Sequence, residues 1–182
     1  MQGNRALVAM VLAIVLLAAG WWLFRRETAD PARQLIPLLA TAEKRPAGGI
    51  FEVIQADVNG ETKEAIYTVP PSRLYFNVRL PDDAWLRVAV ATKPETWTQE
   101  GDGVLFRFAV SDGRTYDELF TQHVNPFANE GDRKWIQVWV DLSAYGGEEV
   151  DLIFNTNTSA AGQGDDPRND HALWGAPEVV VR

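Results

Sequence analysis

The side chains that could carry acid–base or metal chemistry are few in this chain of 182 residues. It has no cysteine and only two histidines, His123 and His171, which excludes thiolate metal sites, iron–sulfur clusters and cysteine nucleophiles. No nucleophile elbow, P-loop, dinucleotide-binding motif or paired-histidine zinc motif is present. The 25 Asp and Glu residues have no spacing that would assign two of them to glycoside cleavage. We therefore expect a protein that is not an enzyme.

Carboxylates gather in one glycine-rich loop, where Asp165, Asp166, Asn169 and Asp170 lie close together in the sequence. Carboxylate and carbonyl oxygens are the ligands that Ca²⁺ takes at about 2.3–2.6 Å. The spacing does not match an EF-hand loop, and solvated charged loops are commoner than metal sites. A calcium site at Asp165, Asp166 and Asp170 is therefore the minor interpretation, and we expect no other cofactor.

Aromatic residues that could bind a ligand lie in an alternating strand pattern. In residues 135–142 the apolar side chains at even positions would face a core, so Trp135, Gln137 and Trp139 share the opposite face. We expect Trp135 to be structural. An outward tryptophan beside an amide can stack on a sugar or anchor a protein interface, although it could equally cover a sheet edge. Trp139 and Gln137 are the main candidate binding residues, and the further aromatic candidates are Trp85, Trp97 and Tyr116.

An uninterrupted apolar run at residues 6–24 has the length of a transmembrane helix. At about 1.5 Å per residue it would span a hydrocarbon core about 30 Å thick. A cleaved signal peptide is the alternative, but the run is long for one and ends in bulky residues. We predict a membrane anchor over residues 1–26. The side chains expected at the lipid interface are Trp21, Trp22, Arg25 and Arg26.

The rest of the chain divides into a short connection and one domain. Residues 27–49 are predicted to be a stalk or linker, partly helical, because Asp30 and Pro31 form a helix-start signal. In residues 50–182 the hydrophobic period changes to two, with Pro, Gly and Asp turns between short runs. We count about eight runs, the number expected of a jelly roll. The predicted fold is mainly β, an eight-stranded antiparallel jelly-roll sandwich behind one N-terminal transmembrane helix and a short helical stalk.

Charge restricts the partners of this domain. The chain has 17 basic and 25 acidic residues, for a formal net charge of −8. Three of the bases and none of the acids lie in the first 26 residues, which leaves 14 bases against 25 acids, or −11, for the remainder. Such a body repels a phosphate backbone, and its bases are scattered singly or in pairs. We therefore expect no nucleic-acid partner.

Six short motifs follow one another in the second half of the chain. They are Gly101-Asp-Gly-Val-Leu-Phe-Arg-Phe-Ala-Val, Asn125-Pro, Asp132-Arg-Lys-Trp, Val140-Asp-Leu-Ser-Ala-Tyr-Gly-Gly, Val150-Asp-Leu-Ile-Phe and Leu173-Trp-Gly-Ala-Pro. Together they resemble the galactose-binding-like jelly-roll modules appended to bacterial exported sulfatases, glycosyltransferases and other envelope proteins, over roughly residues 70–182. The resemblance implies a non-catalytic sandwich outside the cytoplasm, often with one structural calcium ion. It does not imply a particular ligand.

Two functions remain open. In the first, the domain is an accessory or structural subunit that docks onto another membrane protein, such as a respiratory or photosynthetic complex or an envelope enzyme. In the second, it binds envelope or surface glycans. We expect the first, in the periplasm or at the cell surface, because anchoring raises the effective concentration at a membrane partner. A concave wet cleft beside the aromatic residues would favour sugar, whereas a flat apolar patch continuous with the stalk would favour protein docking.

Overall fold

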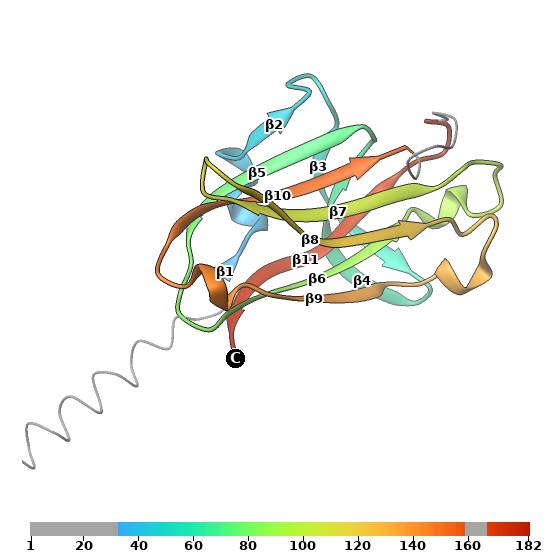
Figure 1. Cartoon of the computed structure of the whole chain (residues 1–182). Coiled ribbons are helices and arrows are strands. Elements are labelled where there is room, and N and C mark those ends of the chain that lie inside the picture. Colours follow the sequence, from blue (N-terminus) through green and yellow to red (C-terminus); the bar gives the residue numbers. More distant parts are fainter. Residues whose placement is uncertain (1–32, 159–166) are drawn as a thin grey trace, which may run out of the picture. The chain divides into compact units, whose positions relative to one another are not determined.

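The computed structural model describes residues 33–158 and 167–182, which form two stacked β-sheets (Figure 1). Sheet A contains β1 (Arg33–Gln34), β3 (Phe51–Val58), β4 (Glu61–Thr68), β6 (Ala84–Thr92), β9 (Ile136–Asp141) and β11 (Ala172–Val181). Sheet B contains β2 (Glu43–Arg45), β5 (Ser72–Arg79), β7 (Val104–Ser111), β8 (Tyr116–Val124) and β10 (Glu149–Asn157). Sheet A has the order β3-β4-β11-β6-β9, with β1 paired to β11, and sheet B has the order β2-β5-β10-β7-β8. Neighbouring strands in both sheets are antiparallel.

The predicted two-sheet antiparallel sandwich is confirmed, but the strand number is not. The described residues form eleven strands where about eight were expected, partly because β1 and β2 are only two and three residues long. The helices of the described residues are 3-10 turns: η1 (Ile36–Ala40), η2 (Pro94–Thr96), η3 (Glu130–Asp132) and η4 (Ser143–Tyr145). Within residues 33–158 and 167–182, no helix is long and apolar enough to cross a membrane. The predicted anchor, with Trp21, Trp22, Arg25 and Arg26, lies outside the described residues.

The main core fills the space between the two sheets. Its centre is aromatic: Phe154 of β10 meets Trp174 of β11 edge to face, with ring centroids 5.0 Å apart, and Phe106 of β7 meets the same indole at 5.0 Å. Edge-to-face pairs are favoured because the positive ring edge meets the negative face of its neighbour. Trp174, the tryptophan of the Leu-Trp-Gly-Ala-Pro motif, is therefore at the centre of the core, with 1% of its surface exposed.

The segment expected to form a stalk contributes to the sandwich from residue 33 onward. Leu35, Ile36 and Leu39 are buried in the main core; Ile36 and Leu39 lie on the same side of η1, three residues apart, and Leu35 directly precedes it. The backbone N–H of Leu35 donates to the carbonyl of Pro177 at 2.9 Å, which continues the pairing of β1 with β11. The compact unit accordingly begins at Ala32.

The outer face of sheet A also buries apolar side chains. A second cluster there contains Trp135, Tyr67 and Leu173 over small residues of the neighbouring strands, including Ala65 and Ala89. Sheets covered on both faces have strands that are apolar at successive positions. This explains why β6 is buried from Val88 to Thr92 without alternation. The outer face of sheet A is therefore partly covered by packed side chains, which can hold the residues of a site in fixed positions.

Candidate functional site

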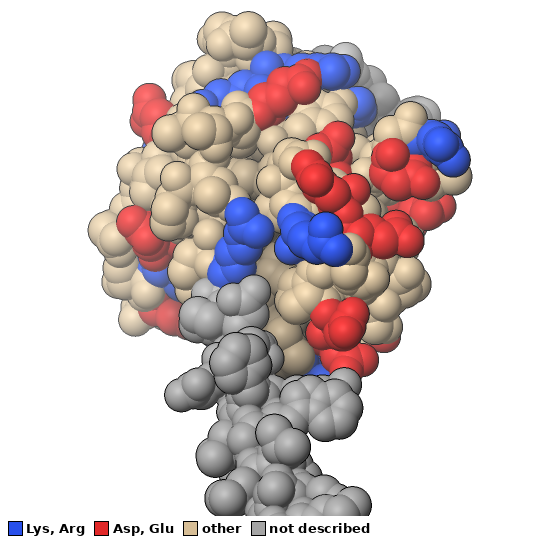
Figure 2. Space-filling model, turned by 90° about the vertical axis from the view of Figure 1, so that its left-hand side faces the viewer, with Lys and Arg blue, Asp and Glu red and all other residues tan. Residues whose placement is uncertain are grey.

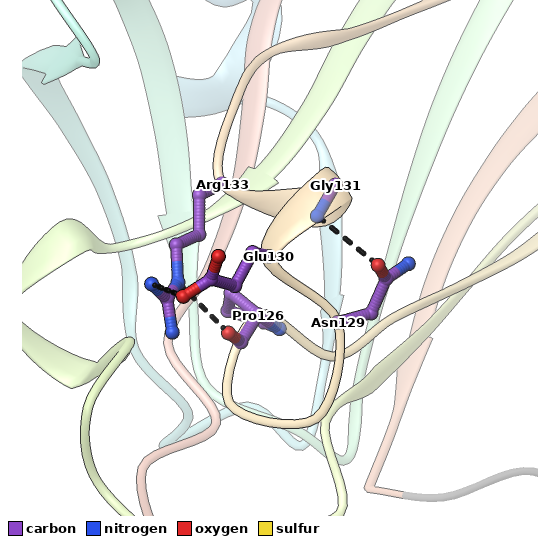
Figure 3. A network of polar contacts seen from close by, with 5 residues as sticks. All are labelled: Pro126, Asn129, Glu130, Gly131 and Arg133. Carbon is purple, nitrogen blue, oxygen red and sulfur yellow. Dashed lines mark hydrogen bonds and ion pairs between the residues drawn. The ribbon is translucent and has the colours of Figure 1, made fainter.

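The loop between β8 and β9 is held by its own polar contacts (Figure 3). Arg133 donates through Nε to the carbonyl of Pro126 at 3.0 Å and pairs through Nη1 with Glu130 at 2.8 Å. The N–H of Gly131 donates to Oδ1 of Asn129 at 3.0 Å, which closes the turn at η3. Arg133 thus binds residues of its own loop, and these contacts fix the position at which the chain enters β9.

Trp135 follows this loop and lies across the outer face of sheet A. Its indole N–H donates to the carbonyl of Glu61 at 2.8 Å, and 6% of its surface is exposed. The ring rests on Gly175 of β11, where a Cβ atom would stand 2.7 Å from Cζ3 of the indole. Only glycine leaves room for this contact. Trp135 is therefore a buried wall of the face, as expected for a structural residue.

A groove of about 250 Å³ opens beside Trp135 on the same face. A β-bulge in β11 between Gly175 and Glu178 shapes it, and Ala176 within the bulge has a φ of +44°. Bulges of this kind bend a strand and redirect its side chains. The groove is lined by Lys63, Arg87, Val88, Ala89, Gln137, Gly175, Ala176 and Glu178.

Glu178 is a buried carboxylate at the floor of this groove. Only 3% of the residue is exposed, so its charge needs partners within the protein. Oε1 accepts hydrogen bonds from Nε and Nη2 of Arg87, and Oε2 accepts one from the side chain of Gln34 at 2.7 Å. This network fixes the guanidinium of Arg87 at the edge of the groove.

Two arginines and two tryptophans form what we call the Trp–Arg stack: Trp85, Arg182, Trp139 and Arg87. Arg87 stands opposite Trp139 in the β6–β9 register, with its guanidinium carbon 5.6 Å from the centre of that indole. Arg182 lies 4.7 Å from the Trp139 ring and 5.1 Å from the Trp85 ring. Guanidinium groups are attracted to aromatic faces at such distances. The stack is solvent-accessible, because 43% of Trp139 is exposed.

The structure brings together some of the predicted binding residues and separates the others. Gln137 and Trp139 point from the outer face of β9, and Trp85 lies diagonally across from Trp139 on β6. Trp97 follows η2 at the end of the sandwich, is half-buried, and donates through its indole N–H to the carbonyl of Thr92 at 3.2 Å. Tyr116 is 48% exposed but belongs to β8 of sheet B.

A second depression, of about 350 Å³, lies where η2 meets the start of β11. Nδ1 of His171 lies 2.6 Å from the hydroxyl of Tyr67, and Nζ of Lys93 lies 3.7 Å from the centre of the Tyr67 ring. Burial, reinforced by the charge of Lys93, lowers the pKa of His171 below its ordinary 6.5. Burial, together with the charge of Glu52, raises the pKa of Tyr67 above 10.0. At neutral pH both rings are therefore uncharged.

The described residues do not test the predicted calcium site as a whole. No group of three histidine, aspartate or glutamate side chains that could hold a metal ion occurs in residues 33–158 and 167–182. Asp170 is 2% exposed, whereas Asp165 and Asp166 lie outside the described residues, so the calcium site stays a prediction. Figure 2 shows one face of the molecule, on which Lys and Arg side chains are interspersed with Asp and Glu side chains.

Comparison with known sequences gives one relative and no family. No protein-family model matches the chain. An uncharacterized protein of Archaeoglobus fulgidus is 32% identical over 130 residues. The match covers 71% of this chain and 30% of that protein, so the chain spans less than a third of its relative's length.

Comparison with solved structures identifies the fold. A family 51 carbohydrate-binding module of Clostridium perfringens in complex with methyl-galactose has a TM-score of 0.53 at 14% identity, covering 76% of this chain and 92% of the module. A C. perfringens structure of an M60 catalytic domain with two such modules has a TM-score of 0.55 at 18% identity, covering 76% and 14%. A family 22 xylan-binding domain of Paenibacillus barcinonensis has a TM-score of 0.52 at 8% identity, covering 83% and 98%. The expected galactose-binding-like jelly-roll fold is thereby confirmed.

Proposed function

We propose that this protein is a non-catalytic glycan-binding module whose ligand lies in the groove on the outer face of sheet A. One observation carries the proposal: a concave, polar groove lined by Gln137 and Arg87 opens on the face of the sheet where Trp139 is exposed, and the Arg87 guanidinium carbon lies 5.6 Å from the centre of the Trp139 ring. A sugar ring has hydroxyl groups around its rim and C–H groups on its faces. It therefore needs hydrogen-bonding side chains and an aromatic surface in one place.

The groove meets both needs. Gln137 offers an amide, which both donates and accepts hydrogen bonds, and Arg87 offers the nitrogen that Glu178 does not use. Trp139 offers apolar surface beside them. Ala89, a small residue that lines the groove, lets a ligand approach the backbone of the sheet closely.

Two considerations favour glycan binding over the docking function that we expected first. The exposed Trp139 lies on the same sheet face as a polar groove, opposite Arg87, which lines that groove. The residues from 33 onward that were expected to form a stalk are part of the sandwich. The fold is also that of modules whose solved structures include complexes with sugars, such as the C. perfringens module with methyl-galactose. We keep membrane anchoring by residues 6–24 as part of the proposal, with the domain outside the cytoplasm.

Trp139→Ala tests the site. The full chain, purified in detergent, is screened on an array of bacterial and plant glycans, and the affinity for each hit is measured by titration calorimetry. We expect Trp139→Ala to weaken binding by about tenfold or more, because an anchoring aromatic is worth about 2 kcal/mol. Tyr116→Ala, which removes a similarly exposed aromatic from sheet B, should bind like the unaltered chain. Equal losses in both variants, or no glycan bound at all, would contradict the proposal.

A further inference from the structure

We infer that the Trp–Arg stack selects glycans that carry carboxylate groups, such as those built from uronic acids. This inference rests on the proposed function, because it assigns a class of ligand to the same face. The carrying observation is the position of Arg182, whose guanidinium lies within cation–π distance of both Trp85 and Trp139. The two indoles hold this charge at the surface of an otherwise acidic protein.

Stacking leaves the hydrogen-bonding capacity of a guanidinium free. The contacts with Trp85 and Trp139 engage the π faces of the indoles, whereas the five N–H groups of Arg182 point outward in the guanidinium plane. A planar fork of this kind matches the two oxygens of a carboxylate. The Arg182 side chain makes no ion pair or hydrogen bond with the residues that the structure describes, so these donors are available to a ligand.

The other charges near the groove are already paired. Arg87 is committed to Glu178 through two of its nitrogens, and Lys63 is paired with Glu61 at 2.6 Å. Both pairs leave their part of the groove close to neutral. The charge on the stack that a ligand can neutralise is therefore that of Arg182, with the third nitrogen of Arg87 as a second donor.

Because the chain as a whole is acidic, the positive charge of Arg182 decides where an anionic ligand can bind. A polyanion is repelled by a body with 25 acids, so it binds only where a cation is fixed to receive it. Asp141 stands opposite Trp85, and hydrogen bonds from the side chain and backbone of Ser143 hold its pKa below the ordinary value. Asp141 therefore stays ionised at neutral pH and disfavours a carboxylate placed at the Trp85 end of the stack. We expect the ligand carboxylate to lie on the Trp139 side.

The test compares two forms of one polymer. The full chain in detergent is titrated with polygalacturonate and with fully methyl-esterified polygalacturonate, in calcium-free buffer at low ionic strength. The backbone of the polymer is the same in both, but esterification removes the charge. We expect the acidic form to bind about tenfold more tightly, since a charge-assisted hydrogen bond is worth about 1.5 kcal/mol or more. The preference should shrink as salt is added.

Arg182→Gln should abolish the preference for the acidic polymer while leaving the fold intact, because the residue is exposed at the end of β11. Arg114→Gln, which removes an exposed arginine from the β7–β8 turn of sheet B, should keep it. Equal binding of the two polymers, or an unchanged preference in Arg182→Gln, would overturn the inference. Binding of neutral galactan or xylan with no preference for acid would overturn it while leaving the proposed function in place. Failure of every glycan to bind would overturn both.

Discussion

Gly175 shows how one missing side chain shapes the candidate site. Its position in β11 lets the Trp135 ring lie against the sheet, next to residues that line the groove. A methyl group there would meet two ring carbons at 2.7 and 2.9 Å, well inside contact distance. The tryptophan cannot retreat freely, because its N–H is bonded to the carbonyl of Glu61.

Gly175→Ala should therefore destabilise the domain by about 1–3 kcal/mol, the usual cost of overpacking. The free energy of unfolding is measured by urea denaturation of the full chain in detergent, followed by tryptophan fluorescence. Gly48→Ala is the matched control, because a Cβ atom there meets nothing within 4 Å. A loss no larger than that of the control would mean that the indole moves aside at little cost.

The sequence predicts which face a side chain lies on where apolar and polar residues alternate along one strand. It does not predict contacts between side chains of strands that are distant in the sequence. The pattern of residues 135–142 correctly places Gln137 and Trp139 on the outer face. Arg87, Glu178 and Arg182 were not singled out, since nothing in their local sequence indicates that β6 and the end of the chain pair side by side. A lone acid between two apolar residues near the end of the chain, as at Glu178, is the one signal that could have suggested a buried ion pair.

At the scale of elements, η1 and the residue before it, Leu35, contribute buried side chains to the core between the sheets. Leu35 is completely buried and belongs to the core between the sheets, although its segment reads in the sequence as a spacer. Leu35→Ala should cost about 2–4 kcal/mol of unfolding free energy, because it removes a large side chain and leaves a cavity. Leu38→Ala in the same turn, where the side chain is partly exposed, should cost much less. Urea denaturation of both variants checks this, and equal costs would show that η1 does not seal the core.

Most strands from residue 50 onward could be predicted from the sequence because their apolar periodicity is strong. The exception is β8, which was not among the expected runs, since its sequence is largely polar and most of its side chains are exposed. Phe106, Phe108 and Val110 of β7 alternate as expected toward the core. The two shortest strands could not be predicted in this way. β1 and β2 are too short to show a period, and they exist because β11 and β5 offer them an edge. These two strands form because they pair with β11 and β5, and not because of a strand pattern in their own residues.

At the scale of the whole molecule, membrane attachment follows from residues 6–24 and is a separate prediction. We expect the full chain to stay in the membrane pellet after extraction with alkaline carbonate. The double substitution Leu12→Arg and Leu16→Arg should release it, because an arginine near the middle of a spanning helix costs about 2.5–3.5 kcal/mol. Glycan binding by the released protein should be unchanged. If the double variant remains in the pellet, attachment depends on another part of the chain.

The link between Gln34 and Glu178 has a mechanical consequence. β1 is joined to β11, the strand that carries the bulge of the groove, through backbone pairing and through this side-chain bond at 2.7 Å. Tension applied to the N-terminal side of β1 therefore reaches β11 before it reaches sheet B. With the proposed anchor at the N-terminal side and a polymer held in the groove as proposed, a pull on that polymer would strain one strand pair at the groove, while the aromatic core between the sheets carries little of the force.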